Sequence, residues 1–462
     1  MKLNKKITSL AFAVALTLLT ILSTTSCSLE ALLENYIEQQ SATNTQTPTP
    51  PYADSTSGSQ DDSDSTSGSQ DDSGSTSGSQ DGSGSTSGSQ DGSGTTDTDG
   101  EQIFYPDANN PEDIELLSPD TRTLLSTVLV SSKFDTLSYY EVLQTDLSYG
   151  SGVIYKLDRE AGNAYIITNY HVVYNANEIN ENGFSDEITL SLYGMRQEQY
   201  AIPATVVGGS MNYDIAVLRV DNSEVLKNSM ATAAVLGDSE AVRVFDEVFA
   251  VGNPEGLGMS ATEGSVSVES ESLNILGPDK KTMLTMRVMR FSAAVNNGNS
   301  GGGLYDSDGN LIGIVNAKLT GAEVDNIGYA IPINLAVKVT ENILRNCDGD
   351  TNLSVKKALI GITVSPISSG LVTDGDGNLV IVEQVSIKGI QETCITDGLC
   401  AGDIINSVTI DGKKTEVTRE YHLIDSLLDA SVGSTVVLNI TRGEESFDLT
   451  LIIPETAISV IK

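Results

Sequence analysis

A serine surrounded by glycines is the first candidate for chemistry in this sequence. Ser300 lies in residues 296–304, which read Asn-Asn-Gly-Asn-Ser-Gly-Gly-Gly-Leu. Glycine permits backbone conformations that other residues resist, and it lets another segment approach closely. Acyl transfer needs an exposed hydroxyl on such a turn, with backbone N–H groups directed at the developing oxyanion. The stretch therefore predicts a nucleophile loop, and a polar turn between two strands is the alternative.

A histidine and an aspartate upstream of the serine could complete its chemistry. His171 follows an apolar run that ends at residue 168, and Asp214 precedes the apolar run 215–220. A serine needs a base that takes its proton, and the base needs a carboxylate that fixes its tautomer. The order His171, Asp214, Ser300 is that of chymotrypsin. The second histidine, His422, follows the serine in a separate segment and is interpreted as a solvated helix residue.

These segments resemble the motifs of the HtrA-type serine proteases, which are trypsin-like enzymes with a C-terminal PDZ domain. The matching motifs are residues 168–172, 214–218, 252–256 and 298–304. The resemblance extends over roughly residues 120 to 455 and implies a mainly β chain. It implies a chymotrypsin-like double β-barrel at residues 113–347 and a small α+β PDZ domain at residues 352–457. Runs of β-branched residues between Gly, Asn and Asp turns are consistent with such barrels. They predict strands that include residues 215–220, 283–291 and 311–315.

The resemblance also implies a role for each candidate of the catalytic site. Ser300 would be the nucleophile, His171 the general base and acid, and Asp214 the orienting carboxylate. The N–H groups of Gly298 and Ser300 would form the oxyanion hole. No metal ion or cofactor is expected, because the acidic turns 306–310 and 374–378 lack the glutamate that completes an EF-hand.

The primary substrate pocket would have an apolar base. Ala294 lies six positions before the nucleophile, and the resemblance places Ile314 and Ala330 on the pocket walls. Without a countercharge at Ala294, a buried Lys or Arg of the substrate would be costly. We therefore expect cleavage after small or medium aliphatic residues, with Lys318 as a neighbouring residue that could admit an acidic side chain instead.

The segment 358–362 resembles the carboxylate-binding loop of a PDZ domain. It reads Ala-Leu-Ile-Gly-Ile, so that Leu359, Ile360, Gly361 and Ile362 are the candidate peptide-binding residues. In this fold the C-terminus of a peptide adds as a strand, and backbone N–H groups hold its carboxylate. The alternative is a PDZ-like spacer without a free ligand.

Several positions depart from the family pattern. Gly303 and Asn297 stand where the family has proline, Ser292 replaces an aspartate, and the glycine expected near Phe245 is missing. None of these changes removes a member of the triad. The expected function is a serine endopeptidase that cleaves unfolded or misfolded extracytoplasmic proteins. A non-catalytic peptide-binding or stress-sensing protein on the same scaffold is the alternative.

The N-terminal part indicates export and tethering. Residues 1–27 have a Lys-rich start and an apolar run that is too short for a comfortable membrane span. The small residues that follow, together with Cys27, resemble a bacterial lipoprotein processing site. An ordinary signal peptide with an incidental cysteine is the alternative. Residues 28–112 contain a Ser/Gly/Asp-rich repeat without apolar residues, which predicts a disordered linker. The expected location is extracytoplasmic, lipid-anchored to the bacterial cell membrane.

The bulk properties restrict the partners. The 462-residue chain has a formal net charge of −37, which argues against nucleic acid as a partner, because phosphate binding needs Lys and Arg clusters. Unfolded polypeptides and peptide C-termini are the expected partners. Members of the family often form homotrimers through residues at the protease N-terminus, where Phe104 and Tyr105 are candidates. Cys394 and Cys400 are close enough in sequence to form a disulfide, but the sequence alone does not decide whether they do.

Overall fold

The computed structural model describes residues 117–137, 142–195, 198–256, 258–317, 327–346, 355–375 and 377–461. The predicted signal peptide, Cys27, the linker, Phe104, Tyr105, Lys318 and Cys347 lie outside these residues. In the described part, no helix has both the length and the apolar character needed to cross a membrane.

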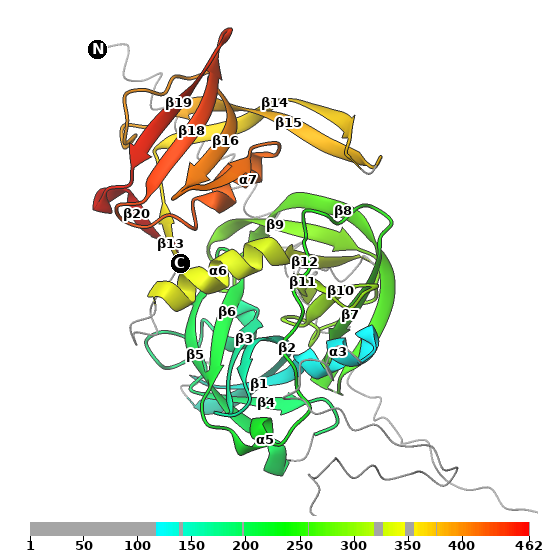
Figure 1. Ribbon diagram of the computed structural model, residues 1–462. Coiled ribbons are helices and arrows are strands. Elements are labelled where there is room, and N and C mark those ends of the chain that lie inside the picture. The colour runs from blue at the N-terminus through cyan, green and yellow to red at the C-terminus, as the bar shows by residue number, and fades with distance from the viewer. Residues whose placement is uncertain are drawn as a thin grey trace, which may run out of the picture. The chain divides into compact units, whose positions relative to one another are not determined.

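The first part of the described chain is a closed barrel with the strand order β1-β2-β3-β6-β5-β4 (Figure 1). Helix α3 (Pro119–Ser126) precedes it, and Ser118 caps this helix by accepting a hydrogen bond from the Thr121 N–H. In β1, alternate residues such as Val128, Val130 and Phe134 are buried, as expected for a strand with one face on a core. The strands are β1 (Thr127–Leu137), β2 (Leu143–Asp158), β3 (Asn163–Thr168), β4 (Glu187–Leu192), β5 (Ile202–Ser210) and β6 (Ile215–Val220).

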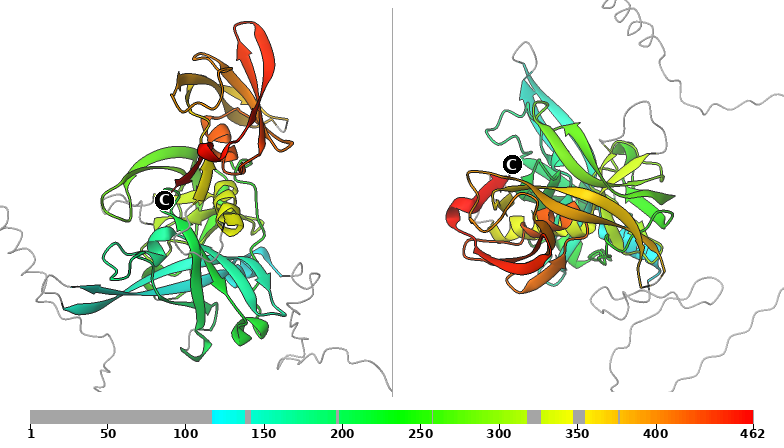
Figure 2. Two further views of the ribbon diagram at one scale, coloured as in Figure 1. Left: turned by 90° about the vertical axis from the view of Figure 1, so that its left-hand side faces the viewer. Right: turned by 90° about the horizontal axis from the view of Figure 1, so that it is seen from above.

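The next part repeats this architecture as a second closed barrel with the order β10-β11-β12-β9-β8-β7. Its strands are β7 (Glu247–Gly252), β8 (Ser260–Leu276), β9 (Met283–Phe291), β10 (Gly303–Asp306), β11 (Leu311–Val315) and β12 (Gly328–Pro332). Helix α6 (Ile333–Asn346) follows and packs against strands of both barrels (Figures 1 and 2). It buries Leu335, Val339 and Ile343 in a core that includes residues of both barrels. Short helical turns complete this part, namely η1 (Glu198–Tyr200), α4 (Tyr170–Val173), α5 (Glu224–Lys227) and η2 (Pro254–Gly256).

Gly303, where the family pattern has proline, is tightly packed in β10. A Cβ atom at this position would overlap the ring of Tyr305. Tyr305 is fully buried, and its hydroxyl group shares hydrogen bonds with Ser126 (3.0 Å) and Thr127 (2.9 Å). The tyrosine ring therefore fills the space that a larger residue at position 303 would need.

The C-terminal domain contains a sheet with the order β14-β15-β16-β18-β19 and a separate pair of β13 with β20. Helix α7 (Glu420–Ser426) lies on the side of the domain that is turned toward the barrels (Figure 1). The strands are β13 (Val355–Ala358), β14 (Ile362–Thr373), β15 (Leu379–Ile390), β16 (Ile404–Ile410), β17 (Lys413–Glu416), β18 (Thr435–Arg442), β19 (Glu445–Ile452) and β20 (Ile458–Ile461), with the turn η4 (Glu455–Ala457) before β20. Cys394 and Cys400 are both free thiols.

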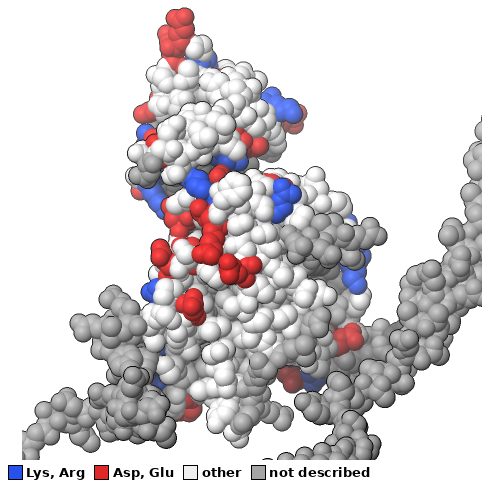
Figure 3. All heavy atoms as spheres, turned by 90° about the vertical axis from the view of Figure 1, so that its right-hand side faces the viewer, with Lys and Arg blue, Asp and Glu red and all other residues white. Residues whose placement is uncertain are grey.

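The structure has the predicted mainly β fold class, with two closed barrels followed by a small domain that contains one helix. One face of the folded part shows a cluster of acidic side chains and no comparable cluster of Lys and Arg (Figure 3).

Candidate functional site

His171 and Asp214 are in direct contact. His171 lies in the one-turn helix α4, directly after β3, and Asp214 lies in the turn before β6. The His171 Nδ1 atom is 2.6 Å from Asp214 Oδ2, and the backbone N–H of His171 donates a hydrogen bond to Asp214 Oδ1 at 3.0 Å. Asp214 has a φ of 49°, a conformation that aspartate tolerates better than most residues. The pair therefore has the geometry in which a carboxylate orients an imidazole ring.

The backbone around this pair is fixed by further hydrogen bonds. The carbonyl oxygen of Asp214 accepts hydrogen bonds from the Asn169 side-chain amide (2.9 Å) and from the Tyr170 N–H (3.1 Å). The Tyr170 ring packs against Gly209 and contacts the rings of Tyr174 and Phe184. These contacts hold α4, and with it His171, against the first barrel.

Asn316 is a site residue that the sequence analysis missed. It follows β11 directly, is fully buried, and donates a hydrogen bond from Nδ2 to Asp214 Oδ2 at 2.7 Å. The Asp214 carboxylate is itself buried and receives donors from both barrels. Its place as a polar residue directly after the apolar run 311–315 was the feature of the sequence that could have indicated a site residue.

Ser300 lies next to this assembly, on the loop before β10. The backbone N–H of Ala317 donates a hydrogen bond to Ser300 Oγ at 3.2 Å, so residues 316 and 317 contact Asp214 and Ser300 in succession. No hydrogen bond joins Ser300 Oγ to His171 Nε2 in the described structure. Catalytic hydrogen bonds are often long in the absence of a ligand and shorten in the complex.

The loop that carries Ser300 presents two unused donors. Gly298 has a φ of 98° and Gly301 a φ of 85°, both in the range that favours glycine. Within the described residues, no acceptor receives a hydrogen bond from the N–H groups of Gly298 or Ser300. Two free donors at this position are what an oxyanion hole requires.

Ser151 holds this loop from the first barrel and was also missed by the sequence analysis. Its hydroxyl group donates a hydrogen bond to the Gly298 carbonyl oxygen (2.8 Å) and accepts one from the Asn253 N–H (2.8 Å). Its backbone N–H donates to the Ser300 carbonyl oxygen at 2.8 Å. The flanking residues Gly150 and Gly152 leave space for the side chains of Val172 and Ile166. Two glycines around a serine were the feature of the sequence that could have indicated tight packing at Ser151.

The three predicted pocket residues differ in exposure. Ala294 is exposed, and its carbonyl oxygen accepts a hydrogen bond from Thr262 Oγ1 at 2.8 Å. Ile314 and Ala330 are fully buried in the cores of the barrels. Their assignment to a substrate pocket stays a prediction.

The predicted peptide-binding loop borders a small apolar groove of about 180 Å³ between β14 and α7. Leu359 is half exposed, Ile360 is buried, and Gly361 has a φ of 77° that a larger residue would resist. Within the described residues, the N–H groups of Ile360 and Gly361 have no acceptor. Strand β14 is the edge of its sheet, so this side can accept an added strand. The other residues that line the groove are Lys357, Ala358, Ile362, Val364, Gln391, Leu423, Ile424 and Leu427.

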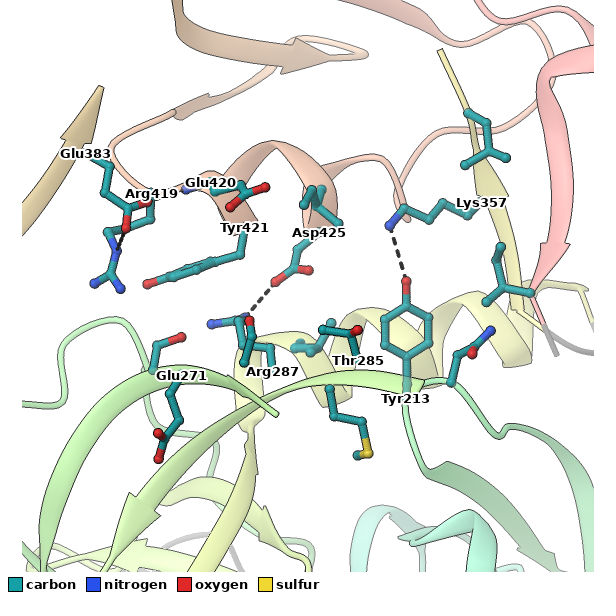
Figure 4. A pocket seen from close by; sticks show the side chains of 18 residues that line it. Tyr213, Glu271, Thr285, Arg287, Lys357, Glu383, Arg419, Glu420, Tyr421 and Asp425 are labelled. Atoms are coloured by element: carbon teal, nitrogen blue, oxygen red, sulfur yellow. Dashed lines mark hydrogen bonds and ion pairs between the residues drawn. The ribbon is translucent and has the colours of Figure 1, made fainter. Parts of the chain in front are cut away.

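A larger cavity of about 650 Å³ separates the barrels from the C-terminal domain (Figure 4). Arg287 of β9 forms an ion pair with Asp425 of α7 at 2.6 Å, and its guanidinium group lies 4.0 Å from the centre of the Tyr421 ring. Lys357 Nζ lies 3.3 Å from the Tyr213 hydroxyl group, and burial lowers the pKa of Lys357.

His422 differs from the expectation of a solvated helix residue. Its Nε2 atom lies 3.3 Å from Glu240 Oε2, across the boundary between the barrels and the C-terminal domain. Burial acts to raise the pKa of Glu240, but hydrogen bonds from His422 and Tyr421 and the charge of Arg287 outweigh it and lower this pKa to about 2. Helix α7 therefore contributes both to the groove and to this polar contact.

In both acidic turns, a carboxylate oxygen of the first aspartate accepts hydrogen bonds from backbone N–H groups of the turn. Asp306 Oδ1 accepts hydrogen bonds from the N–H groups of Asp308 and Asn310, and Asp374 Oδ1 accepts one from the Asn378 N–H. Over the described ranges, no group of three or more His, Cys, Asp or Glu side chains is arranged to hold a metal ion.

Comparisons with known proteins show which family the chain resembles. Residues 150–314 match the trypsin-like peptidase domain family. The chain is 30% identical to the serine protease Do-like HtrA of Bacillus subtilis (strain 168) over 322 residues, which covers 68% of this chain and 65% of that protein. It is 30% identical to the protein of the same name from Lactococcus lactis subsp. cremoris (strain MG1363) over 312 residues, which covers 65% of this chain and 69% of that protein.

Among solved structures, the HtrA-type protease AlgW with a decapeptide has a TM-score of 0.46 at 24% identity, covering 73% of this chain and 97% of that chain. The chain spans about two thirds of the length of the curated relatives named above. Because the chain is 30% identical to the Lactococcus lactis protein and covers 69% of it, the chain belongs to the HtrA-type family of trypsin-like serine proteases.

Proposed function

We propose that this serine endopeptidase cleaves peptide bonds through Ser300, His171 and Asp214. Ser300 Oγ attacks the carbonyl carbon of the substrate, and His171 accepts the hydroxyl proton. Asp214 keeps the imidazole ring in the tautomer that can accept the proton and stabilises the imidazolium ion. The N–H groups of Gly298 and Ser300 stabilise the oxyanion. His171 then donates the proton to the leaving amine, and water hydrolyses the acyl-enzyme.

One observation carries this proposal. The His171–Asp214 contact of 2.6 Å lies beside a serine loop whose two candidate oxyanion donors have no acceptor in the described part of the chain. One observation favours the non-catalytic alternative, because the described partner of Ser300 Oγ is the Ala317 N–H and not His171. An activated serine is therefore the property that must be tested.

The test is labelling with a fluorophosphonate, which reacts only with an activated serine. We expect the wild type to be labelled and to hydrolyse casein, and Ser300→Ala to do neither. Loss of one triad member typically costs several powers of ten in rate, so that His171→Ala should be about as inactive. Casein hydrolysis by Ser300→Ala at the wild-type rate would refute the assignment.

The substrates that we propose are unfolded or misfolded polypeptides, with cleavage after Val, Ala, Ile or Leu. Ala294 offers no countercharge, and a methylene group in an apolar pocket is worth only about 1–3 kcal/mol, so several side chains should be accepted. Mass-spectrometric mapping of the cuts in an unfolded protein tests this. A majority of cuts after Lys or Arg would contradict it.

The C-terminal domain is proposed to bind peptide C-termini as a PDZ domain. The free N–H groups of Ile360 and Gly361 support this, because a carboxylate is a strong acceptor for such a pair. A peptide with a free, apolar C-terminus should bind, and the same peptide with a C-terminal amide should bind more weakly. Equal affinity of the two peptides would support a spacer domain without a ligand.

We also propose an extracytoplasmic location with a lipid anchor at Cys27, supported by the residues that precede this cysteine. Metabolic labelling with a fatty acid should mark the wild type but not Cys27→Ser, which should be released into the medium or remain unprocessed. Equal labelling of the two forms, or of neither, would remove this proposal.

A further inference from the structure

The turn that carries Asp214 has a strained backbone. Asp214 is the last residue of the turn 211–214 between β5 and β6, and its N–H donates a hydrogen bond to the Met211 carbonyl oxygen at 3.3 Å. Its φ of 49° lies in the left-handed region, which is unfavourable for residues other than glycine. Such conformations persist only where the surrounding structure fixes them. The contacts of the neighbouring residue Tyr213 therefore bear on the geometry of Asp214.

The side chain of Tyr213 contacts the C-terminal domain. Figure 4 shows its hydroxyl group pointing toward Lys357 of β13, and Lys357 Nζ donates a hydrogen bond to this hydroxyl oxygen at 3.3 Å. The Tyr213 ring packs against a buried core that includes Leu335 of α6 and Val355 of β13. Burial, and to a lesser extent the charge of Asp425, raises the pKa of Tyr213, so its hydroxyl group is uncharged at neutral pH.

The strand that carries Lys357 is itself fixed to helix α6. Asn342 Nδ2 donates a hydrogen bond to the Lys356 carbonyl oxygen at 2.7 Å, and the Lys356 N–H donates one to Asn342 Oδ1 at 2.9 Å. Helix α6 in turn packs against strands of both barrels, β5 and β6 among them. Strand β13 is therefore a fixed support from which Lys357 reaches the turn before β6.

Lys357 depends on Tyr213 as its polar partner. The residue is only 9% exposed, and burial lowers the pKa of Lys357 because an amino group is costly to charge away from water. The Asp425 carboxylate acts in the opposite direction, but it forms its ion pair with Arg287 at 2.6 Å. In the described part of the chain, the Tyr213 hydroxyl group is the acceptor for Lys357 Nζ. Loss of that acceptor would leave a buried amino group unpaired, which costs more than replacing both partners by apolar groups.

We propose that Tyr213 is a positioning residue, which keeps the turn 211–214 in place from the C-terminal domain and so holds the Asp214 carboxylate beside His171. This inference rests on the proposed function. Tyr213 acts on the reaction through Asp214 and not through the substrate. The C-terminal domain then supports the catalytic site through Lys357, in addition to its proposed binding of peptides.

Full-length Tyr213→Phe tests the proposal, because it keeps the ring and removes the acceptor for Lys357. The substrate is a peptide with a C-terminal amide, which limits its binding to the groove of the C-terminal domain. We expect kcat to fall about threefold to tenfold, the range for the loss of one hydrogen bond, with little change in KM. Unchanged kcat, or a rise in KM alone, would contradict a role that acts through Asp214.

A second substitution should rescue the first. Lys357→Met removes the amino group that Tyr213→Phe leaves unpaired, so it should lower kcat less than Tyr213→Phe does. The double variant Tyr213→Phe, Lys357→Met should be faster than Tyr213→Phe and similar to Lys357→Met, because the two residues act as one contact. A double variant slower than Tyr213→Phe would overturn the proposal.

Lys338→Met is the matched control for a looser domain contact. Lys338 of α6 forms an ion pair with Asp429 of the C-terminal domain at 2.8 Å, so this contact also joins the two parts of the protein but involves neither Tyr213 nor Asp214. The kcat of Lys338→Met should equal that of the wild type. An equal fall in kcat for Lys338→Met and Tyr213→Phe would assign the effect to the domain contact in general and overturn the positioning role.

Proton NMR measures the position of Asp214 directly. A proton in a short hydrogen bond between an imidazole ring and a carboxylate gives a separate low-field signal, and the His171–Asp214 contact of 2.6 Å is short enough for one. The chain has only two histidines, so His171→Ala assigns the signal. The signal should broaden or move upfield in Tyr213→Phe and stay unchanged in Lys338→Met. A lower melting temperature of Tyr213→Phe with an unchanged signal and kcat would make Tyr213 a core residue only, which overturns the proposal.

The measurements separate this inference from the proposed function. If the wild type hydrolyses no substrate, the proposed function fails, and the His171 signal of the same variants still tests whether Tyr213 holds Asp214 in place. If the wild type is active and Tyr213→Phe has the same kcat and the same signal, the positioning role is overturned while the proposed function stands.

Discussion

The side-chain amide of Asn316 donates a 2.7 Å hydrogen bond to Oδ2 of Asp214, the same oxygen that contacts His171. The bond joins the second barrel to the acid of the first barrel. In the proposed mechanism Asn316 is therefore a positioning residue, which would act on the reaction through Asp214 without contacting the reacting atoms.

Asn316→Ala should lower kcat/KM by about tenfold to a hundredfold, because a hydrogen bond to a charged group is worth about 1.5–3 kcal/mol. Asn316→Ser, which keeps a donor, should restore part of the activity. Asn342→Ala is the matched control, since Asn342 is also buried and donates hydrogen bonds of 2.7 Å, far from the site. Steady-state kinetics would contradict the role if the two alanine variants were equally active.

Gly303→Ala should lower the free energy of unfolding by about 1–3 kcal/mol, because the added methyl group overlaps the buried Tyr305 ring. In a Tyr305→Leu background the same substitution should cost much less. Urea unfolding of the four proteins measures this coupling. Gly370→Ala serves as a control, since nothing lies within 4 Å of the added atom there. Additive effects of the two substitutions would show that the ring is not the obstacle.

Phe245→Gly should stabilise the protein. Phe245 has a φ of 80° and is 86% exposed, so that it contributes strain without much packing. Removal of the strain should raise the free energy of unfolding by about 1–2 kcal/mol. The greater freedom of glycine in the unfolded chain should offset about half of this gain. The melting temperature should rise for Phe245→Gly and fall for the neighbouring control Val244→Gly. A fall for both variants would indicate that Phe245 has a partner that stabilises it.

Glu240→Gln should lower stability in a pH-dependent manner. The pKa of Glu240 is lowered from 4.5 to about 2, so the ionised group stabilises the folded state above pH 4.5, and this contribution disappears as the pH falls toward 2. The difference in melting temperature between wild type and Glu240→Gln should therefore be full at pH 6 and vanish near pH 2. Glu247→Gln, an exposed carboxylate at the start of β7, is the control. A difference that is independent of pH would exclude the charge as its cause.

Much of the fold was predictable because many of its strands are rich in β-branched or other apolar residues and end at turn residues. The predicted strands at residues 215–220, 283–291 and 311–315 agree with β6, β9 and β11. Strand β8 was missed because its sequence is rich in Ser and Glu and most of it is only partly buried. Strand β14 contains Pro366 and Gly370, which usually indicate a turn.

The contacts between distant segments were not predictable from local patterns. Asn316 and Asp214 are 102 residues apart, and His422 is 182 residues from Glu240. A buried asparagine or an interfacial histidine has no distinctive sequence periodicity. The pairing of His171 with Asp214 was predicted only because their motifs recur in a known order.

Ser151 has a consequence for the response of the enzyme to heat. Its single hydroxyl group, on a strand of the first barrel, holds the carbonyl oxygen of Gly298 and the N–H of Asn253, which both belong to the second barrel. A small separation of the barrels would release the loop that carries Ser300 while each barrel kept its own sheet. Thermal inactivation is therefore expected to begin below the temperature at which circular dichroism records the loss of secondary structure.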